Sequence, residues 1–142
     1  MDSIDIVRVF SCHVPVKPVP QGRPRTTKRG TFYPKRSLDY RNLLIHHFTL
    51  AHRNRKPLKP PVSLHLRVCG PHRSSDLSNH LKMVEDALVD AGVISDDNVQ
   101  HISQVTVDAD WEGEPATWVR IFGQGTIADH LGTLAAGLFE EE

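Results

Sequence analysis

The alternation of hydrophobic and polar positions is most regular in the segment VSLHLRV, residues 62–68, where every second residue is apolar. This period of two is typical of a β-strand that turns one face toward a core. Three further segments rich in β-branched or aromatic residues predict strands as well: residues 4–16, 99–109 and 117–123. We therefore expect a sheet built from these four segments.

Two other segments carry apolar residues at the spacing of an α-helix. The first spans residues 37–54, and its apolar positions are Leu38, Leu43, Leu44, Phe48 and Ala51. Ser37 stands where it can cap this helix. The second helix is expected to begin near Ser78 and to end at Gly92, and its apolar stripe consists of Leu81, Val84, Leu88 and Ala91.

The order of these elements favours an α+β domain, a small mixed β-sheet flanked by helices, over residues 1–125. A short C-terminal helix with an acidic tail is expected to follow over residues 126–142. A chain of 142 residues with 39% hydrophobic content can bury a core of its own. Cys12 and Cys69 lie in strand-like apolar segments without metal-ligand spacing, so we expect buried free thiols.

No apolar run approaches the roughly 18 residues that a membrane-spanning helix needs. We therefore expect no membrane partner and a cytoplasmic location.

The charges are distributed unevenly, although the formal net charge is zero. Residues 1–60 hold 13 of the 17 Lys and Arg and 3 of the 17 Asp and Glu, which gives a charge of +10. Residues 61–142 hold the other 4 Lys and Arg and the other 14 Asp and Glu, which gives a charge of −10. Such asymmetry is typical of a surface that binds a polyanion. The alternative is that the two halves attract one another within the fold.

The basic charge is densest in the segment KPVPQGRPRTTKRGTFYPKR, residues 17–36, which is also rich in Pro and Gly. This composition excludes a helix and argues against a central strand. A surface for phosphates and a solvated flexible segment are both compatible with it.

The second predicted helix has acidic residues at both of its ends. Asp76 precedes it, and Asp96 and Asp97 follow in a predicted turn. Each position has an ordinary structural explanation, because Asp commonly caps helices and is a common turn residue. The combination suggests more, since Asn79, Lys82 and Asp86 would share one helix face that looks toward these acids.

A cluster of carboxylate and amide oxygens is suited to Mg²⁺ or Mn²⁺. Such an ion polarises a phosphate and activates a water in phosphodiester hydrolysis. Lys82 would then stabilise the charge that develops on the phosphate.

The segment DLSNHLKMVEDALVDAGVISDD resembles the core motif of RusA-type Holliday junction resolvases, which are found in bacteria and bacteriophages. That motif runs Asp-x-Asp-Asn-x-x-Lys, then a helix with Asp-Ala-Leu, then Asp-Asp. The basic segment resembles the Arg-Pro-Arg and Tyr-x-Pro-Lys sequences of phage members, and the matching stretches together cover roughly Arg8 to Val107. In contrast to the motif, Ser78 replaces the second aspartate.

The resemblance implies that Asp76, Lys82, Asp96 and Asp97 form a Mg²⁺-dependent endonuclease site, in which the three aspartates bind the metal. Ser78 and Asn79 are further candidate site positions. Weaker metal binding, a remodelled site, loss of catalysis and deliberate alteration of the chain would each explain Ser78.

The resemblance also implies a homodimer that places two sites across the branch point of a four-way DNA junction and cuts opposing strands. The residues expected to bind DNA phosphates are Arg23, Arg25, Lys28, Arg29, Lys35 and Arg36. Two other functions remain as alternatives: a branched-DNA-binding protein that has lost catalysis through Ser78, and an interaction protein that recruits partners through its C-terminal tail.

Overall fold

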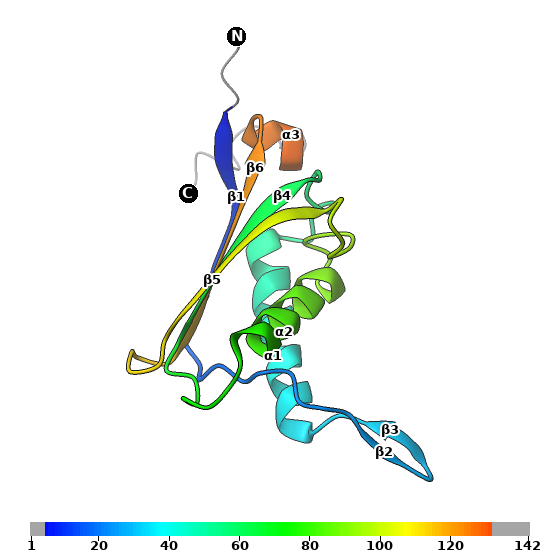
Figure 1. The fold of residues 1–142 in the computed structure, drawn as a ribbon. Coiled ribbons are helices and arrows are strands. Elements are labelled where there is room, and N and C mark those ends of the chain that lie inside the picture. The colour runs from blue at the N-terminus through cyan, green and yellow to red at the C-terminus, as the bar shows by residue number, and fades with distance from the viewer. Residues whose placement is uncertain (1–4, 132–142) are drawn as a thin grey trace.

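The alternating segments form one four-stranded sheet in the computed structural model, which describes residues 5–131 (Figure 1). Its strands are β1 (Ile6–Val14), β4 (Val62–Cys69), β5 (Ile102–Asp110) and β6 (Ala116–Gln124). They lie in the order β1-β6-β4-β5. The strands β4 and β5 are parallel, whereas β6 is antiparallel to both of its neighbours. The sheet is therefore mixed, and the predicted α+β class is confirmed.

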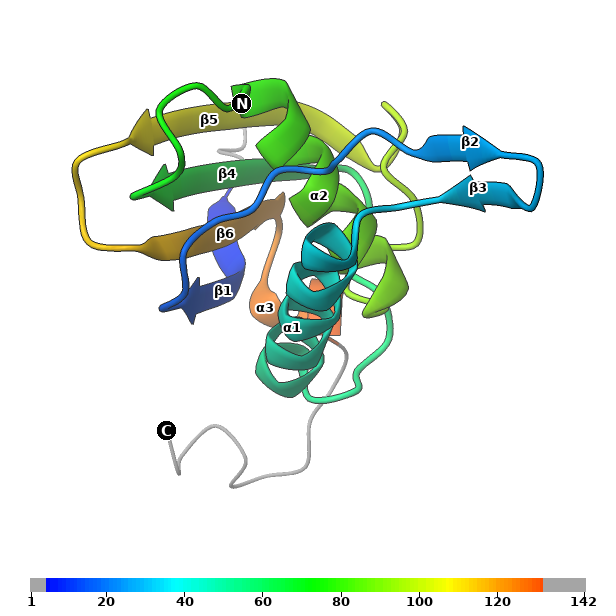
Figure 2. The ribbon, with the colours of Figure 1, turned by 90° about the horizontal axis from the view of Figure 1, so that it is seen from below.

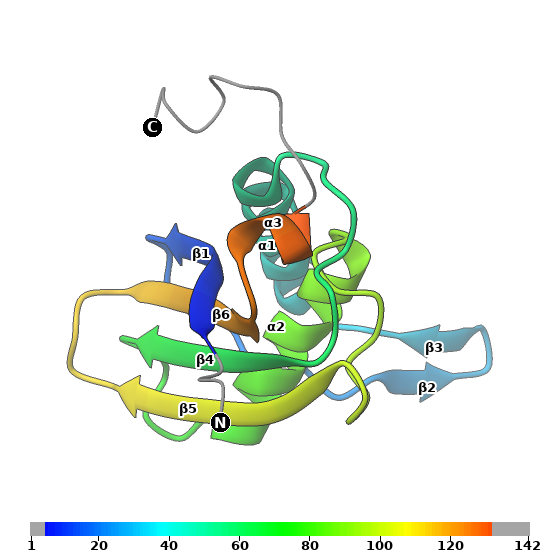
Figure 3. The same ribbon diagram turned by 90° about the horizontal axis from the view of Figure 1, so that it is seen from above.

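Two helices, α1 (Lys35–His52) and α2 (Leu77–Asp90), cover one face of this sheet, whereas its other face carries no described helix (Figures 1 and 3). The helix α2 connects the parallel strands β4 and β5. The alternation in β4 turns Leu64 and Leu66 inward, where they are buried, and leaves His65 and Arg67 exposed on the open face. The core thus lies between the helices and one side of the sheet.

The buried face of α1 differs from the predicted stripe. The structure buries Ser37, Tyr40, Leu44, Phe48 and His52, which mostly follow one another at intervals of four residues. Of the predicted stripe, Leu38 and Ala51 are exposed. Tyr40 and His52, whose polar rings lie outside the predicted apolar stripe, are buried instead. The Tyr40 hydroxyl bonds to Thr117 in the core, and the His52 Nε2 bonds to the Lys56 carbonyl at 2.9 Å.

The basic segment contains a β-hairpin, β2 (Arg25–Thr27) and β3 (Gly30–Phe32), which projects away from the sheet and the helices (Figure 1). Lys28 and Arg29 form its two-residue loop. The loop ends at Gly30, whose φ of 123° is accessible to glycine and strained for other residues. The sequence excluded a helix here, as observed, but did not predict the hairpin.

Ser37 does not cap α1, because the helix begins two residues earlier, after Pro34. Its hydroxyl instead accepts a hydrogen bond from the Gly22 N–H at 3.1 Å and donates one to the Pro20 carbonyl at 3.4 Å. A third bond runs from the Gln21 N–H to the Asn79 carbonyl of α2, at 3.1 Å. The chain that leads into the hairpin is therefore fixed between α1 and α2.

The predicted tail begins with a short helix, α3 (Ile127–Leu131), and residues 132–142 lie outside the described part of the chain. His130 of α3 is buried over Gly123, and its Nε2 bonds to the Gln124 carbonyl at 2.7 Å. Cys12 and Cys69 are buried free thiols, as predicted, and burial raises the pKa of Cys12 to about 11. None of the described helices is long and apolar enough to cross a membrane.

Candidate active site

Asp76 is the N-cap residue of α2, with extended backbone angles. Its carbonyl accepts the N–H groups of Asn79 and His80 at 3.1 and 3.2 Å. Its carboxylate makes no capping hydrogen bond within the described structure. Capping is the ordinary role of an aspartate at this position, so the exposed Asp76 carboxylate remains available for a ligand.

His80 holds the approach to Asp76 in place. Its ring is buried, and its Nε2 bonds to the Ser75 hydroxyl at 2.8 Å. The same hydroxyl donates to the His72 carbonyl at 2.6 Å. Burial lowers the pKa of His80, which favours the neutral ring. Sequence reasoning missed this positioning residue, although its place three residues before Met83 and four before Val84, both buried, puts it on the apolar face of α2.

Lys82 lies at the centre of the charged face of α2. Its Nζ is 3.1 Å from Asp86 Oδ1 and 3.5 Å from Asp97 Oδ2. The hydrogen bond to Asp86, followed by the charges of Asp86 and Asp97, raises the pKa of Lys82 against the opposing effect of burial. The ammonium therefore stays charged at neutral pH, next to two carboxylates.

The two aspartates of the motif pair have different surroundings. Asp96 is engaged within its own turn, because its Oδ1 accepts the Asp97 N–H at 2.7 Å and its Oδ2 accepts from Asn98 Nδ2 at 3.2 Å. Asn98 in turn accepts from the Gln100 N–H at 3.0 Å. Asp97 is the member of the pair that reaches Lys82. The turn thus presents one carboxylate to α2 and uses the other to hold its own shape.

The structure does not gather all the predicted metal ligands. Within residues 5–131, no group of three or more His, Cys, Asp and Glu side chains is arranged to hold a metal ion. Asp76 and Lys82 are six residues apart, which corresponds to about 9 Å along a helix axis. The Lys82 ammonium also turns toward Asp86, away from the start of the helix. Asp97 therefore approaches the middle of α2, whereas Asp76 stands at its beginning.

Ser78 and Asn79 are exposed in the first turn of α2, on the same end as Asp76. The Ser78 side chain carries no charge, so this end holds one carboxylate where the resembling motif has two. The Asn79 backbone carbonyl binds the basic segment through Gln21. Asn79 therefore connects the acidic end of α2 with the cationic part of the chain.

Glu85 is an acid near this site that sequence reasoning missed. It is partly buried, and burial, followed by the negative charge of Asp97, raises its pKa. Lys82 acts in the opposite direction. Its position three residues after Lys82, beside the apolar stripe, is the sequence signal that could have indicated both its burial and its proximity to the charged face.

The basic segment passes next to this acidic site. The chain between β1 and β2 crosses α2 before it enters the hairpin (Figure 2). Of the residues expected to bind DNA, Arg25 opens β2 and Lys28 with Arg29 forms the hairpin loop. Lys35 and Arg36 lie in the first turn of α1, and the exposed Lys35 pairs with Asp39 at 3.8 Å. Cations thus extend from the edge of the acidic site to the hairpin loop.

Comparison with known proteins agrees with the resemblance. Residues 15–122, about three quarters of the chain of 142 residues, match the family described as Endodeoxyribonuclease RusA. No curated protein gives a significant match. The matched region includes the basic segment, α2 and the turn with Asp96 and Asp97. The chain belongs to the RusA family of endodeoxyribonucleases, the enzymes that resolve Holliday junctions.

Proposed function

We propose that this chain is a divalent-metal-dependent endodeoxyribonuclease that cuts four-way DNA junctions by paired nicks, in DNA recombination and repair. The observation that carries the proposal is the position of Lys82, whose ammonium lies between Asp86 and Asp97 on the face of α2 next to the anchored basic segment. A charged lysine beside free carboxylate oxygens is suited to a scissile phosphate, because it stabilises negative charge as the phosphate reacts.

The donor set of this site fits Mg²⁺, with Mn²⁺ as a substitute. Mg²⁺ commonly takes one or two protein carboxylates and keeps its other positions for waters and phosphate oxygens. Asp96 already uses both of its oxygens within its turn, which leaves Asp76 and Asp97 as the carboxylates that would hold the ion. In the free protein they lie at different positions along α2, so one ion would bind both only after the Asp97 side chain leaves Lys82. When bound, the ion would polarise the phosphate and activate a water.

Lys82 has two successive roles in this proposal. In the free protein its single positive charge pairs with both Asp86 and Asp97 and holds the Asp97 carboxylate toward α2. When DNA binds, its ammonium becomes a partner of the phosphate. The Lys82 side chain is 53% exposed, so it can reach a ligand without rearrangement of the core.

The hairpin and the first turn of α1 would bind the arms of the junction. Arg23, Lys28 and Arg29 are exposed. Phosphate contacts of this kind supply affinity that falls steeply with salt, and they do not depend on DNA sequence. Phe32 and Tyr33, which are 52% and 41% exposed, follow these cations and offer flat surfaces to sugars and bases.

A homodimer is part of the proposal, because two opposing nicks in a junction require two sites of this kind. We place the proposed activity in the cytoplasm of a bacterium or of a phage-infected cell.

A labelled four-way junction, compared with a duplex of the same sequence, tests the proposal. The wild type should nick the junction in the presence of Mg²⁺ and should leave both substrates intact in EDTA. Asp97→Asn should bind the junction at least as tightly as the wild type and should not cut it, since the substitution lowers the repulsion toward phosphate. Glu112→Gln, at an exposed position of the loop between β5 and β6, removes the same charge elsewhere and should leave cutting unchanged.

Full cutting by Asp97→Asn would exclude the site as proposed. Junction binding without cutting by the wild type, in Mg²⁺ and in Mn²⁺, would favour the alternative of a branched-DNA-binding protein. The serine at position 78 supports that alternative, because it leaves this end of α2 with one charge fewer than the family motif.

A further inference from the structure

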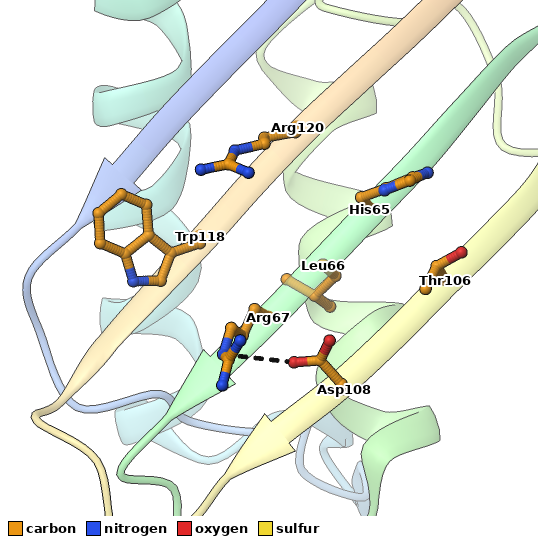
Figure 4. A pocket seen from close by; sticks show the side chains of 7 residues that line it. All are labelled: His65, Leu66, Arg67, Thr106, Asp108, Trp118 and Arg120. Atoms are coloured by element: carbon orange, nitrogen blue, oxygen red, sulfur yellow. Dashed lines mark ion pairs between the residues drawn. The ribbon is translucent and has the colours of Figure 1, made fainter.

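The open face of the sheet carries a group of polar and aromatic side chains, on the side opposite to α1 and α2 (Figures 1 and 4). A shallow depression of about 380 Å³ lies on it. The residues that line it come from β4, β5 and β6: His65, Leu66, Arg67, Thr106, Asp108, Trp118 and Arg120. Because Lys82 and Asp97 lie on the helical side, this surface is separate from the candidate active site.

Trp118 is an exposed aromatic residue among those that line this depression. The alternation of β6 buries Val119 and turns Trp118 outward. The ring of His13, from the neighbouring strand β1, stacks on the indole with the ring centroids 3.9 Å apart and an angle of 17° between the planes. Trp118 still keeps 38% of its surface exposed. One side of the indole is therefore supported by a ring of the protein, and the rest is available to another planar group.

Two arginines flank Trp118. Arg67 lies directly across from it on β4, and Arg120 is two residues away on the same face of β6 (Figure 4). Arg67 pairs with Asp108 on β5 at 3.4 Å, and both side chains are more than half exposed. No ion pair of Arg120 is present among the described residues. Among the residues that line the depression, β4 and β6 thus supply two positive charges beside the indole, and β5 supplies the acidic side chain, Asp108.

A second copy of the chain is a poor occupant for this surface. Strands of eight or nine residues rise about 3.3 Å per residue and lie about 4.8 Å apart, so four of them present roughly 500 Å². Two such faces in contact would bury roughly 1,000 Å², the lower limit for a specific interface. Stable homodimer interfaces are also more apolar than a face of Arg, His, Thr and Asp around one Trp.

Nucleic acid suits the same surface better. An open four-stranded sheet that offers an aromatic ring for a base and cations for phosphates is a recurring way to bind single strands. The volume of the depression is in the range of small-ligand sites, which is appropriate for one nucleotide. We propose that this face binds a single-stranded DNA segment, with one base stacked on Trp118 and neighbouring phosphates at Arg67 and Arg120. DNA is chosen over RNA because the chain belongs to a family of endodeoxyribonucleases.

Fluorescence anisotropy with a labelled oligothymidine of about twelve nucleotides tests this proposal, in EDTA and with the full-length protein. Trp118→Ala should bind the oligothymidine roughly 5- to 150-fold more weakly than the wild type, because it loses one base–aromatic stack. Trp118→Phe should restore most of the affinity, because it restores a ring. Trp111→Ala, a matched control in the exposed loop after β5, should bind like the wild type.

The exposed arginines provide a test that does not depend on the tryptophan. The double variant Arg67→Ala, Arg120→Ala should flatten the plot of log K against log salt by roughly 1.4, the value for two phosphates of a single strand. Junction cutting should persist in both sets of variants, and oligothymidine binding should persist in Asp97→Asn. These readouts keep this proposal separate from the proposed nuclease site.

Three results would overturn the proposal. Equal oligothymidine affinity of the wild type and of Trp118→Ala, with Trp118→Ala folded by circular dichroism, would remove the stacking site. Tighter binding of oligouridine than of oligothymidine would assign the face to RNA. Dissociation of a dimer by Trp118→Ala in sedimentation would assign it to a second copy of the chain.

Discussion

The substitution Ser37→Ala separates the anchoring of the basic segment from its charge. Ser37 is only 6% exposed, and its hydroxyl bonds to the Gly22 N–H at 3.1 Å and to the Pro20 carbonyl at 3.4 Å. The substitution removes both bonds, changes no charge and leaves the bond between Gln21 and Asn79. The segment should therefore remain cationic and become less ordered.

The two hydrogen bonds set the size of the expected loss of stability. A hydrogen bond of this kind contributes about 0.5–1.5 kcal/mol, and the longer of the two contributes less than the shorter one. We expect a loss of about 1–2 kcal/mol of unfolding free energy, which for a chain of this length lowers Tm by roughly 3 to 7 °C. If DNA binding must restore the order, the same free energy weakens junction affinity about 5- to 30-fold.

The assay is junction binding measured over a series of salt concentrations. The number of phosphate contacts does not change in Ser37→Ala, so the slope of log K against log salt should equal that of the wild type while the line moves to lower affinity. Ser103→Ala, at an exposed position of β5, is the matched control and should change neither. Unchanged affinity in a destabilised Ser37→Ala protein would refute the reasoning, because the segment would then need no fixed approach to DNA.

Replacing Arg23 and Arg25 together should flatten the salt slope for the junction by about one to two units without unfolding the domain, and an unchanged slope would assign them to structure. Ser78→Asp should lower the metal concentration needed for half-maximal cutting, and replacing Mg²⁺ by Mn²⁺ should increase cutting more in the wild type than in the variant. Slower cutting by Ser78→Asp at every metal concentration would mean that the arrangement of the site depends on the serine. Because burial raises the pKa of Glu85, the folded state holds the proton more tightly than the unfolded chain, and its ionisation costs stability. Glu85→Gln should therefore be more stable than the wild type in urea unfolding at about pH 7, and this difference should vanish near pH 4, below the ordinary pKa of glutamate; an equal difference at both pH values would exclude ionisation as the cause.

The strands could be predicted from the sequence because alternation records which side of a strand is buried. Three of the four main strands have bounds within about two residues of their predicted segments, whereas β5 begins at Ile102 because residues 98–101 form a turn. The buried face of α1 could not be predicted from hydrophobicity, since the polar groups of Tyr40 and His52 find hydrogen-bond partners within the fold. Tyr40 bonds to Thr117, which is distant in the chain, and His52 bonds to the Lys56 carbonyl on the following loop. The hairpin was missed because its short strands lack apolar alternation.

The candidate site could be predicted only in part. The sequence indicated that Lys82 and Asp86 share a helix face, which follows from a spacing of four, and the structure agrees. The sequence did not distinguish the two members of the acidic pair, and in the structure Asp97 is the one that reaches Lys82. The sequence could not show that the Asp76 carboxylate leaves its helix end uncapped, because that depends on a side-chain rotation. The metal-binding role of these aspartates stays a prediction.

The position of β6 between β1 and β4 has a consequence for how the chain folds. The first strand and the last strand are neighbours, so their pairing joins residues that are more than a hundred positions apart, such as Ile6 and Gln124. Closing a loop of that length costs about 4 kcal/mol of chain entropy, and contacts of this separation slow folding. During synthesis β4, α2 and β5 can assemble early, whereas β1 has no neighbour until β6 leaves the ribosome. Until then, β1 is an unpaired strand that chaperones or other copies of the chain can bind.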